Sequence, residues 1–80
     1  MRVPRDLSGH HLAKALSVFG YRVSRQTGSH IRLETEVDGT HKITIPAHDP
    51  LKIGTLRDII RDLCEHHNLN RDELLKRILS

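Results

Sequence analysis

The sequence has very few aromatic residues: among 80 residues there is no tryptophan, one phenylalanine (Phe19) and one tyrosine (Tyr21). Proteins that read single-stranded RNA on a sheet commonly stack successive bases on exposed aromatic rings. Two rings cannot form such a platform. Any contact with RNA would therefore depend on the phosphate backbone and its shape.

Features of membrane and exported proteins are also missing. No apolar run approaches the roughly 18 residues that a membrane span requires, and residues 1–6 lack the apolar stretch of a signal peptide. The one cysteine, Cys64, cannot form an intramolecular disulfide, which agrees with a reducing compartment. We expect a cytoplasmic protein with no membrane contact.

No set of residues has the spacing of a metal site. Histidines stand side by side at His10-His11 and at His66-His67. Adjacent residues on a helix point about 100° apart and cannot chelate one ion from one face. The sequence therefore predicts two fortuitous surface pairs, no metal and no small-molecule cofactor.

Charge is distributed unevenly along the chain, whose net charge is +3. Residues 1–57 carry 9 Lys and Arg against 5 Asp and Glu, whereas residues 58–80 carry 4 against 5. The basic part contains the predicted strands. This surplus favours a polyanionic partner, although an ordinary solvated surface would also account for so small an excess.

The first half of the chain predicts a helix followed by three strands. Ser8 is suited to cap a helix that runs to about Phe19, and Gly20 supplies the left-handed residue that ends it. Tyr21 and Val23 then alternate with polar residues in a short first strand. Turns at Thr27-Gly28-Ser29 and Asp38-Gly39 predict two further strands, over about 30–37 and 41–45.

The second half predicts a loop and two helices. Residues 46–50 contain two prolines and cannot continue a strand ladder. A helix of about Leu56 to His66 follows with Thr55 as its cap, and Asn70 with Glu73 caps a final helix over about 71–79. The apolar stripe of that last helix must dock, either on this chain or on a partner.

Together these elements predict an α+β fold, in which helices cover one face of a three-stranded antiparallel sheet. We expect one domain over residues 1–80, with a core over about 7–63 and an extra C-terminal helix over about 70–79. The order helix, three strands, helix is that of the double-stranded-RNA-binding domain. Architecture alone does not give a function.

The strongest candidate for chemistry is His30, which begins an alternating run after the Gly28-Ser29 turn. Ile31 and Leu33 of that run suit a core, so His30 points to solvent with its polar neighbours. Side chains that could meet an RNA backbone beside it are Arg22, Arg25, Ser29, Arg32 and Lys42. The alternatives are a surface histidine that hydrogen bonds to Ser29 and ordinary solvated charges on the strands.

Three motifs follow one another along the chain. They are Gly28-Ser29-His30 after a basic strand, Ile45-Pro46-Ala47-His48 after the third strand, and Gly54-Thr55-Leu56-Arg57-Asp58-Ile59-Ile60 at the second helix. From about Leu7 to Leu63 the chain resembles the HicA family of toxin mRNA interferases. The resemblance implies the toxin of a type II toxin-antitoxin system, an endoribonuclease that cleaves mRNA without a metal. It also implies that His30 is catalytic and that a HicB-like antitoxin is the partner.

RNA can be cleaved without a metal when a base removes the 2′-hydroxyl proton and an acid protonates the leaving 5′-oxygen. Imidazole can serve in either role near neutral pH. Water, a phosphate oxygen, or His48 if the proline-rich loop folds back, could fill the second role beside His30. Arg32 and Lys42 could offset the charge that develops on the phosphorane.

Two other functions compete with the ribonuclease. A non-catalytic double-stranded-RNA-binding module of the same fold would carry a lysine cluster at the start of its second helix. That region has two separated cations, Lys52 and Arg57, which disfavours duplex binding. A protein-interaction domain that docks a partner on its final helix is compatible with cleavage.

Overall fold

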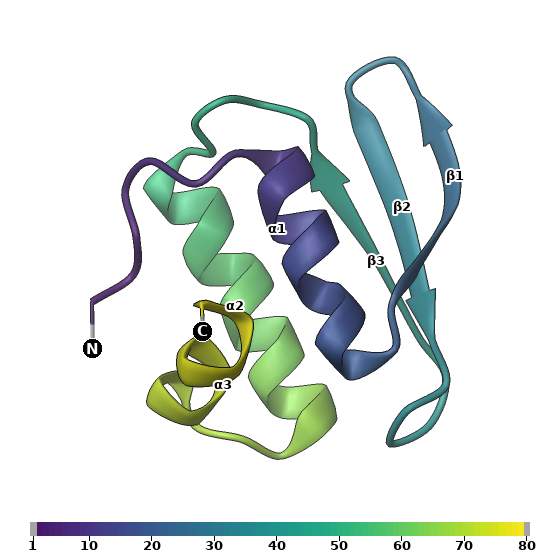
Figure 1. Cartoon of the computed structure of the whole chain (residues 1–80), viewed down its shortest axis with the longest axis vertical. Helices are drawn as coiled ribbons and strands as arrows, with labels where there is room; N and C mark the ends of the chain where they lie inside the picture. Colours follow the sequence, from purple (N-terminus) through teal and green to yellow (C-terminus); the bar gives the residue numbers. More distant parts are fainter. Residues whose placement is uncertain (1, 80) are drawn as a thin grey trace.

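The computed structural model describes residues 2–79, and Met1 and Ser80 lie outside the described part. It contains a helix, three strands and two further helices in that order (Figure 1). The elements are α1 (Gly9–Ala15), the 3₁₀ turn η1 (Leu16–Phe19), β1 (Arg22–Thr27), β2 (His30–Thr35), β3 (His41–Pro46), α2 (Ile53–His67) and α3 (Arg71–Leu79). The predicted α+β order with an added C-terminal helix is confirmed. No helix within residues 2–79 is long and apolar enough to span a bilayer.

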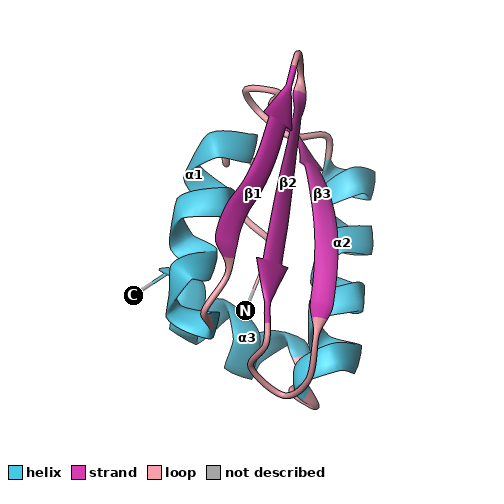
Figure 2. Ribbon diagram, turned by 90° about the vertical axis from the view of Figure 1, so that its right-hand side faces the viewer, coloured by secondary structure: helices cyan, strands magenta, loops and turns pink. Residues whose placement is uncertain are grey.

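The three strands form one antiparallel sheet in the order β1-β2-β3. The helices lie behind this sheet, and its other face is open (Figure 2). Helix α1 packs on β2 and β3, whereas α2 packs on β3. All residues of the edge strand β1 are exposed. The sheet therefore has a covered face and an open face.

The apolar core lies between the covered face and the helices, as the alternating pattern predicts. The inner residues of β2 and β3 are buried in it: Ile31, Leu33, Ile43 and Ile45. Helix α3 docks on this same core, because Leu74, Leu75 and Ile78 are at most 6% exposed. The stripe of the final helix is thus covered by this chain at these three residues, whereas Leu79 is 44% exposed.

The helix ends agree with the prediction at α1 and differ from it at α2. The Ser8 hydroxyl accepts a hydrogen bond from an amide in the first turn of α1 at 3.1 Å, so the predicted cap is confirmed. Helix α2 begins at Ile53, with Lys52 in the N-cap position. Thr55 therefore lies inside the first turn, and its prediction as the cap is wrong.

The prediction of His66 and His67 as a fortuitous surface pair is also wrong, because both rings bond to the turn between β2 and β3. Nε2 of His66 donates to the carbonyl oxygens of Val37 and Gly39, each at 3.0 Å. The buried His67 donates from Nδ1 to the Asp38 carboxylate at 3.0 Å. The end of α2 is therefore tied to the sheet.

Tyr21 extends this cluster to β3. Its hydroxyl lies 2.9 Å from Nε2 of His67 and 2.6 Å from Nδ1 of His41, whose Nε2 donates to Asp62 at 3.1 Å. Burial raises the pKa of Tyr21, and the charges of Asp62 and Asp38 add to the shift, so the hydroxyl stays protonated. The cluster fixes the end of the sheet opposite to the one where β2 begins.

Candidate functional site

His30 is the first residue of β2, and its exposed position alternates with the buried Ile31 and Leu33, so it lies on the open face of the sheet. The turn before it favours glycine, because Gly28 has a φ of 53°. The His30 side chain is exposed, and within residues 2–79 it forms no hydrogen bond or ion pair. The alternative of a histidine bonded to Ser29 is therefore not what the structure shows in that range. The ring is accessible to a ligand.

The backbone before His30 is held by the end of β3. The amide of Ala47 donates to the carbonyl oxygen of Ser29 at 2.6 Å, and Pro46 pairs with His30 in the β2–β3 ladder. Pro46 is thus the last residue of β3, whereas the sequence predicted it as the start of the loop. An edge strand tolerates the missing amide donor of a proline. The motif that contains Pro46 and Ala47 therefore holds the backbone of the motif that contains Ser29 and His30.

Gly9 lets α1 approach this segment closely. Its amide donates to the carbonyl oxygen of His48 at 2.9 Å. A Cβ at Gly9 would overlap the carbonyl oxygen of Pro46. The start of α1, the end of β3 and the start of β2 are therefore packed backbone against backbone beside His30.

An irregularity in β1 brings its arginines to the open face. The ladder with β2 changes register between Val23 and Arg25, which makes Ser24 an extra residue. Residues three apart, such as Arg22 and Arg25, point to opposite faces of a regular strand. The bulge places both opposite the polar residues of β2. Val23, expected on the apolar side, is 55% exposed, as are the other residues of the edge strand β1.

A shallow hollow of about 150 Å³ gathers part of the predicted site. It is lined by His30 and Arg32 of β2, Arg25 and Thr27 of β1, and Thr44 of β3. In the strand register Thr27 pairs with His30, and Thr44 pairs with Arg32. The hollow combines one imidazole with two guanidinium groups, and no carboxylate of the described residues lines it.

Arg22 and Lys42 do not line this hollow, and both lie beside Glu34. Nζ of Lys42 is 3.5 Å from Oε1 of Glu34, and Arg22 pairs with Glu34 across the ladder. A hydrogen bond from Ser24 and the charge of Lys42 hold the pKa of Glu34 below its ordinary value. Because this carboxylate offsets part of their charge, Arg22 and Lys42 are weaker candidates for a phosphate than Arg25 and Arg32.

Ser29 and His48 are exposed but do not line the hollow. The His48 carbonyl bonds to the start of α1, so the loop folds back there rather than bringing the His48 ring into the hollow.

The sequence analysis did not identify Thr27 and Thr44 as site residues. The strand register, which places them opposite His30 and Arg32, would have identified both. Within residues 2–79 no group of three or more His, Cys, Asp or Glu residues could hold a metal ion.

The fold and this hollow define a small α+β protein whose open sheet face presents an exposed histidine beside arginines. The family model described as the HicA toxin of bacterial toxin-antitoxin systems matches residues 9–63, which is more than half of the chain. The chain therefore belongs to the HicA toxin family, which implies a cognate antitoxin as partner. No curated protein and no solved structure matches significantly.

Proposed function

We propose that this toxin is an endoribonuclease that uses His30 to cleave mRNA without a metal. One observation carries the proposal: the exposed His30 ring, unbonded within residues 2–79, shares a hollow with Arg25 and Arg32. Cleavage of a phosphodiester needs a proton acceptor at the 2′-hydroxyl and cations at the phosphate. The hollow offers both. Replacing His30 and measuring RNA cleavage tests the proposal.

In the proposed reaction, His30 accepts the proton of the 2′-hydroxyl and the 2′-oxygen attacks the adjacent phosphorus. The bond between phosphorus and the 5′-oxygen breaks, and that oxygen takes a proton from water or a phosphate oxygen. The products are a 2′,3′-cyclic phosphate and a 5′-hydroxyl. Arg25 and Arg32 stabilise the negative charge of the phosphorane. His48 lies outside the hollow, so we assign it no role as the acid.

The alternative, a non-catalytic module for double-stranded RNA, receives less support. Such a module clamps phosphates with clustered lysines at the start of its second helix. The described start of α2 carries Lys52 and Arg57, five positions apart. An exposed histidine among arginines would also have no evident purpose in such a module.

The contribution of Arg32 to RNA binding can be read from its salt dependence. Binding of a non-cleavable single strand should weaken with salt, and Arg32→Gln should reduce the slope of log K against log salt by about 0.7. Arg22→Gln is the matched control, with a smaller expected change because Glu34 already offsets that charge. Fluorescence anisotropy at several salt concentrations measures both slopes. An unchanged slope in Arg32→Gln would remove Arg32 from the footprint.

We further propose that the antitoxin is HicB-like and covers the open face around His30. The opposite face of the sheet is occupied by the helices (Figure 2). Leu74, Leu75 and Ile78 of α3 are buried in the core. The open face is therefore a surface that a partner can cover without unfolding the toxin, and a partner there would mask His30. A saturating antitoxin should abolish binding of a non-cleavable RNA. Unchanged RNA affinity in the complex would show that inhibition acts elsewhere.

A further inference from the structure

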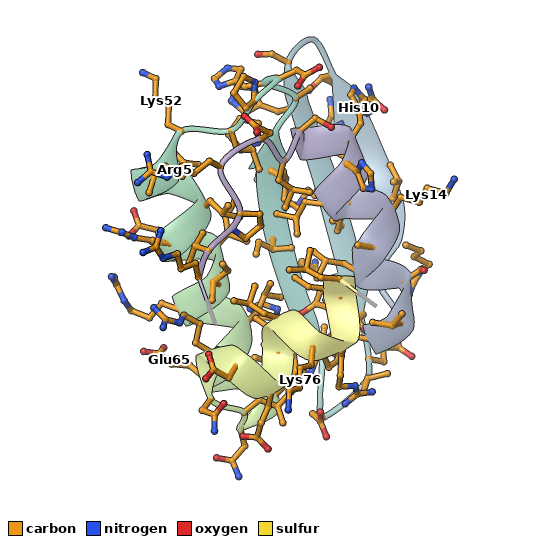
Figure 3. All side chains as sticks on the ribbon, turned by 60° about the vertical axis from the view of Figure 1, so that its left-hand side comes forward. Arg5, His10, Lys14, Lys52, Glu65 and Lys76 are labelled. Atoms are coloured by element: carbon orange, nitrogen blue, oxygen red, sulfur yellow. The ribbon has the colours of Figure 1, made fainter. Side chains whose placement is uncertain are left out.

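A second basic surface lies on the helix side of the molecule, between the N-terminal segment, α2 and the start of α3. Two hollows, of about 340 and about 290 Å³, share the lining residues Val3, Arg57 and Arg71. We call them the arginine groove, after the five arginines that line them: Arg2, Arg5, Arg57, Arg61 and Arg71. Figure 3 shows Arg5 beside the first turns of α2, with the sheet behind the helices. None of the described acidic residues lines the groove.

The positive charge of the groove has little compensation within the chain. Arg61 lies 3.4 Å from Asp58 and Arg71 lies 3.8 Å from Asp72, but both pairs are exposed and therefore weak. Within residues 2–79 no ion pair is formed by the other three arginines, Arg2, Arg5 and Arg57. Like charges gathered in a concave surface raise the local concentration of anions. The groove therefore has the electrostatics of a site for an anionic ligand.

The groove also has apolar surface beneath this charge. Val3 and Cys64 are partly buried against the core, and Ile60 is 3% exposed. Burial raises the pKa of the Cys64 thiol, with Glu73 adding to the shift, so the thiol stays neutral and behaves as a small hydrophobe. Guanidinium groups bind carboxylates through two parallel hydrogen bonds. An aliphatic side chain flanked by carboxylates complements this surface.

We propose that the arginine groove binds an acidic peptide segment of a protein partner, with one aliphatic side chain seated beside Val3 and Ile60. RNA is a poorer fit, because a nucleic acid strand has no aliphatic side chain to place on the apolar surface of Val3 and Ile60. The groove and the hollow around His30 share no residue, so both can be occupied at once. The proposal does not rest on cleavage at His30.

A synthetic peptide tests the proposal with the full chain. The probe carries one leucine between two pairs of glutamates and a fluorescein label, and anisotropy measures its affinity. The double variant Arg57→Gln/Arg71→Gln should weaken binding at least about tenfold. Lys14→Gln, which removes an exposed cation on α1 (Figure 3), is the matched control and should change the affinity less than about twofold. A peptide with serine in place of leucine should bind at least about threefold more weakly.

Two results would overturn the proposal: no binding by the wild type, or equal binding by the wild type and the double variant. A second arm uses a non-cleavable RNA, which should bind both proteins equally and should not displace the peptide. RNA that displaces the peptide and binds the double variant less tightly would identify the groove as an RNA surface and contradict a peptide site. Loss or retention of cleavage in His30→Ala changes none of these binding results. Peptide binding in the groove and cleavage by His30 can therefore be refuted independently.

Discussion

The His30→Ala variant is expected to cleave RNA at least about 100-fold more slowly than the wild type, because a general acid–base group typically contributes about 10²–10⁴-fold. The fold should persist. The side chain is exposed and unbonded within residues 2–79, and such substitutions usually change the free energy of unfolding by less than about 0.5 kcal/mol. Single-turnover cleavage of a labelled RNA measures the rate, and thermal unfolding followed by circular dichroism measures the stability.

His10→Ala is the matched control for this variant. His10 is an exposed histidine on α1 that does not line the hollow, so its replacement should leave the rate of cleavage unchanged. A folded His30→Ala protein that still cleaves RNA at the wild-type rate would remove His30 from the active site. An equal loss of cleavage rate in His10→Ala and His30→Ala would show that the loss does not come from the chemistry of the hollow.

The second large effect is expected at Gly9. Alanine is generally favoured over glycine inside a helix by up to about 1 kcal/mol. In Gly9→Ala, however, the Cβ would overlap the Pro46 carbonyl oxygen and lie 3.1 Å from Cα of Ala47. Overpacking of this kind should lower the free energy of unfolding by at least about 2 kcal/mol. Because Ala47 also bonds to Ser29, the displacement should slow cleavage as well.

Gly54→Ala provides the comparison, because Gly54 also lies in a helix but a Cβ there would meet no atom within 4 Å beyond its chain neighbours and the nearby backbone of its own helix. This variant should be as stable as the wild type or up to about 1 kcal/mol more stable. Chemical denaturation measures both variants under the same conditions. If Gly9→Ala also proved as stable as the wild type, α1 would not lie as close to Pro46 as the structure shows.

The fold could be predicted where a residue's role depends on its near neighbours. The alternation that begins at His30 places Ile31 and Leu33 in the core and His30 on the open face, as the structure shows. The pairing of Asn70 with Glu73 predicts the start of α3, and each of these residues caps the other with a hydrogen bond. Such local signals give the order of the elements and the side of the sheet on which the candidate site lies.

The extent of the site could not be read in the same way, because it depends on pairing between strands. The identity of Ser24 does not predict a bulge. Without the shift in register at this residue, however, Arg22 and Arg25 would lie on opposite faces of the sheet. The strand register also separates the cations that line the hollow from those that lie beside Glu34. Glu34 draws Lys42 away from a phosphate only because the register places them opposite each other.

Long-range contacts also account for the error at the histidine pair. Adjacent residues on a helix point in different directions, which correctly argues against a shared metal ion but says nothing about partners elsewhere in the chain. His67 bonds to Asp38 and Tyr21, which are 29 and 46 residues away. These partners become visible only when the sheet and α2 are placed together.

The most direct test of cleavage by His30 without a metal is the chemistry of the RNA ends formed in EDTA. Transfer of the 2′-hydroxyl proton to His30 and attack by the 2′-oxygen predict a 2′,3′-cyclic phosphate on one fragment and a 5′-hydroxyl on the other. Mass spectrometry of the fragments identifies both ends. The prediction is that these products form at the same rate with and without the chelator. Fragments with 5′-phosphate ends, or cleavage that requires an added divalent metal, would contradict catalysis by His30.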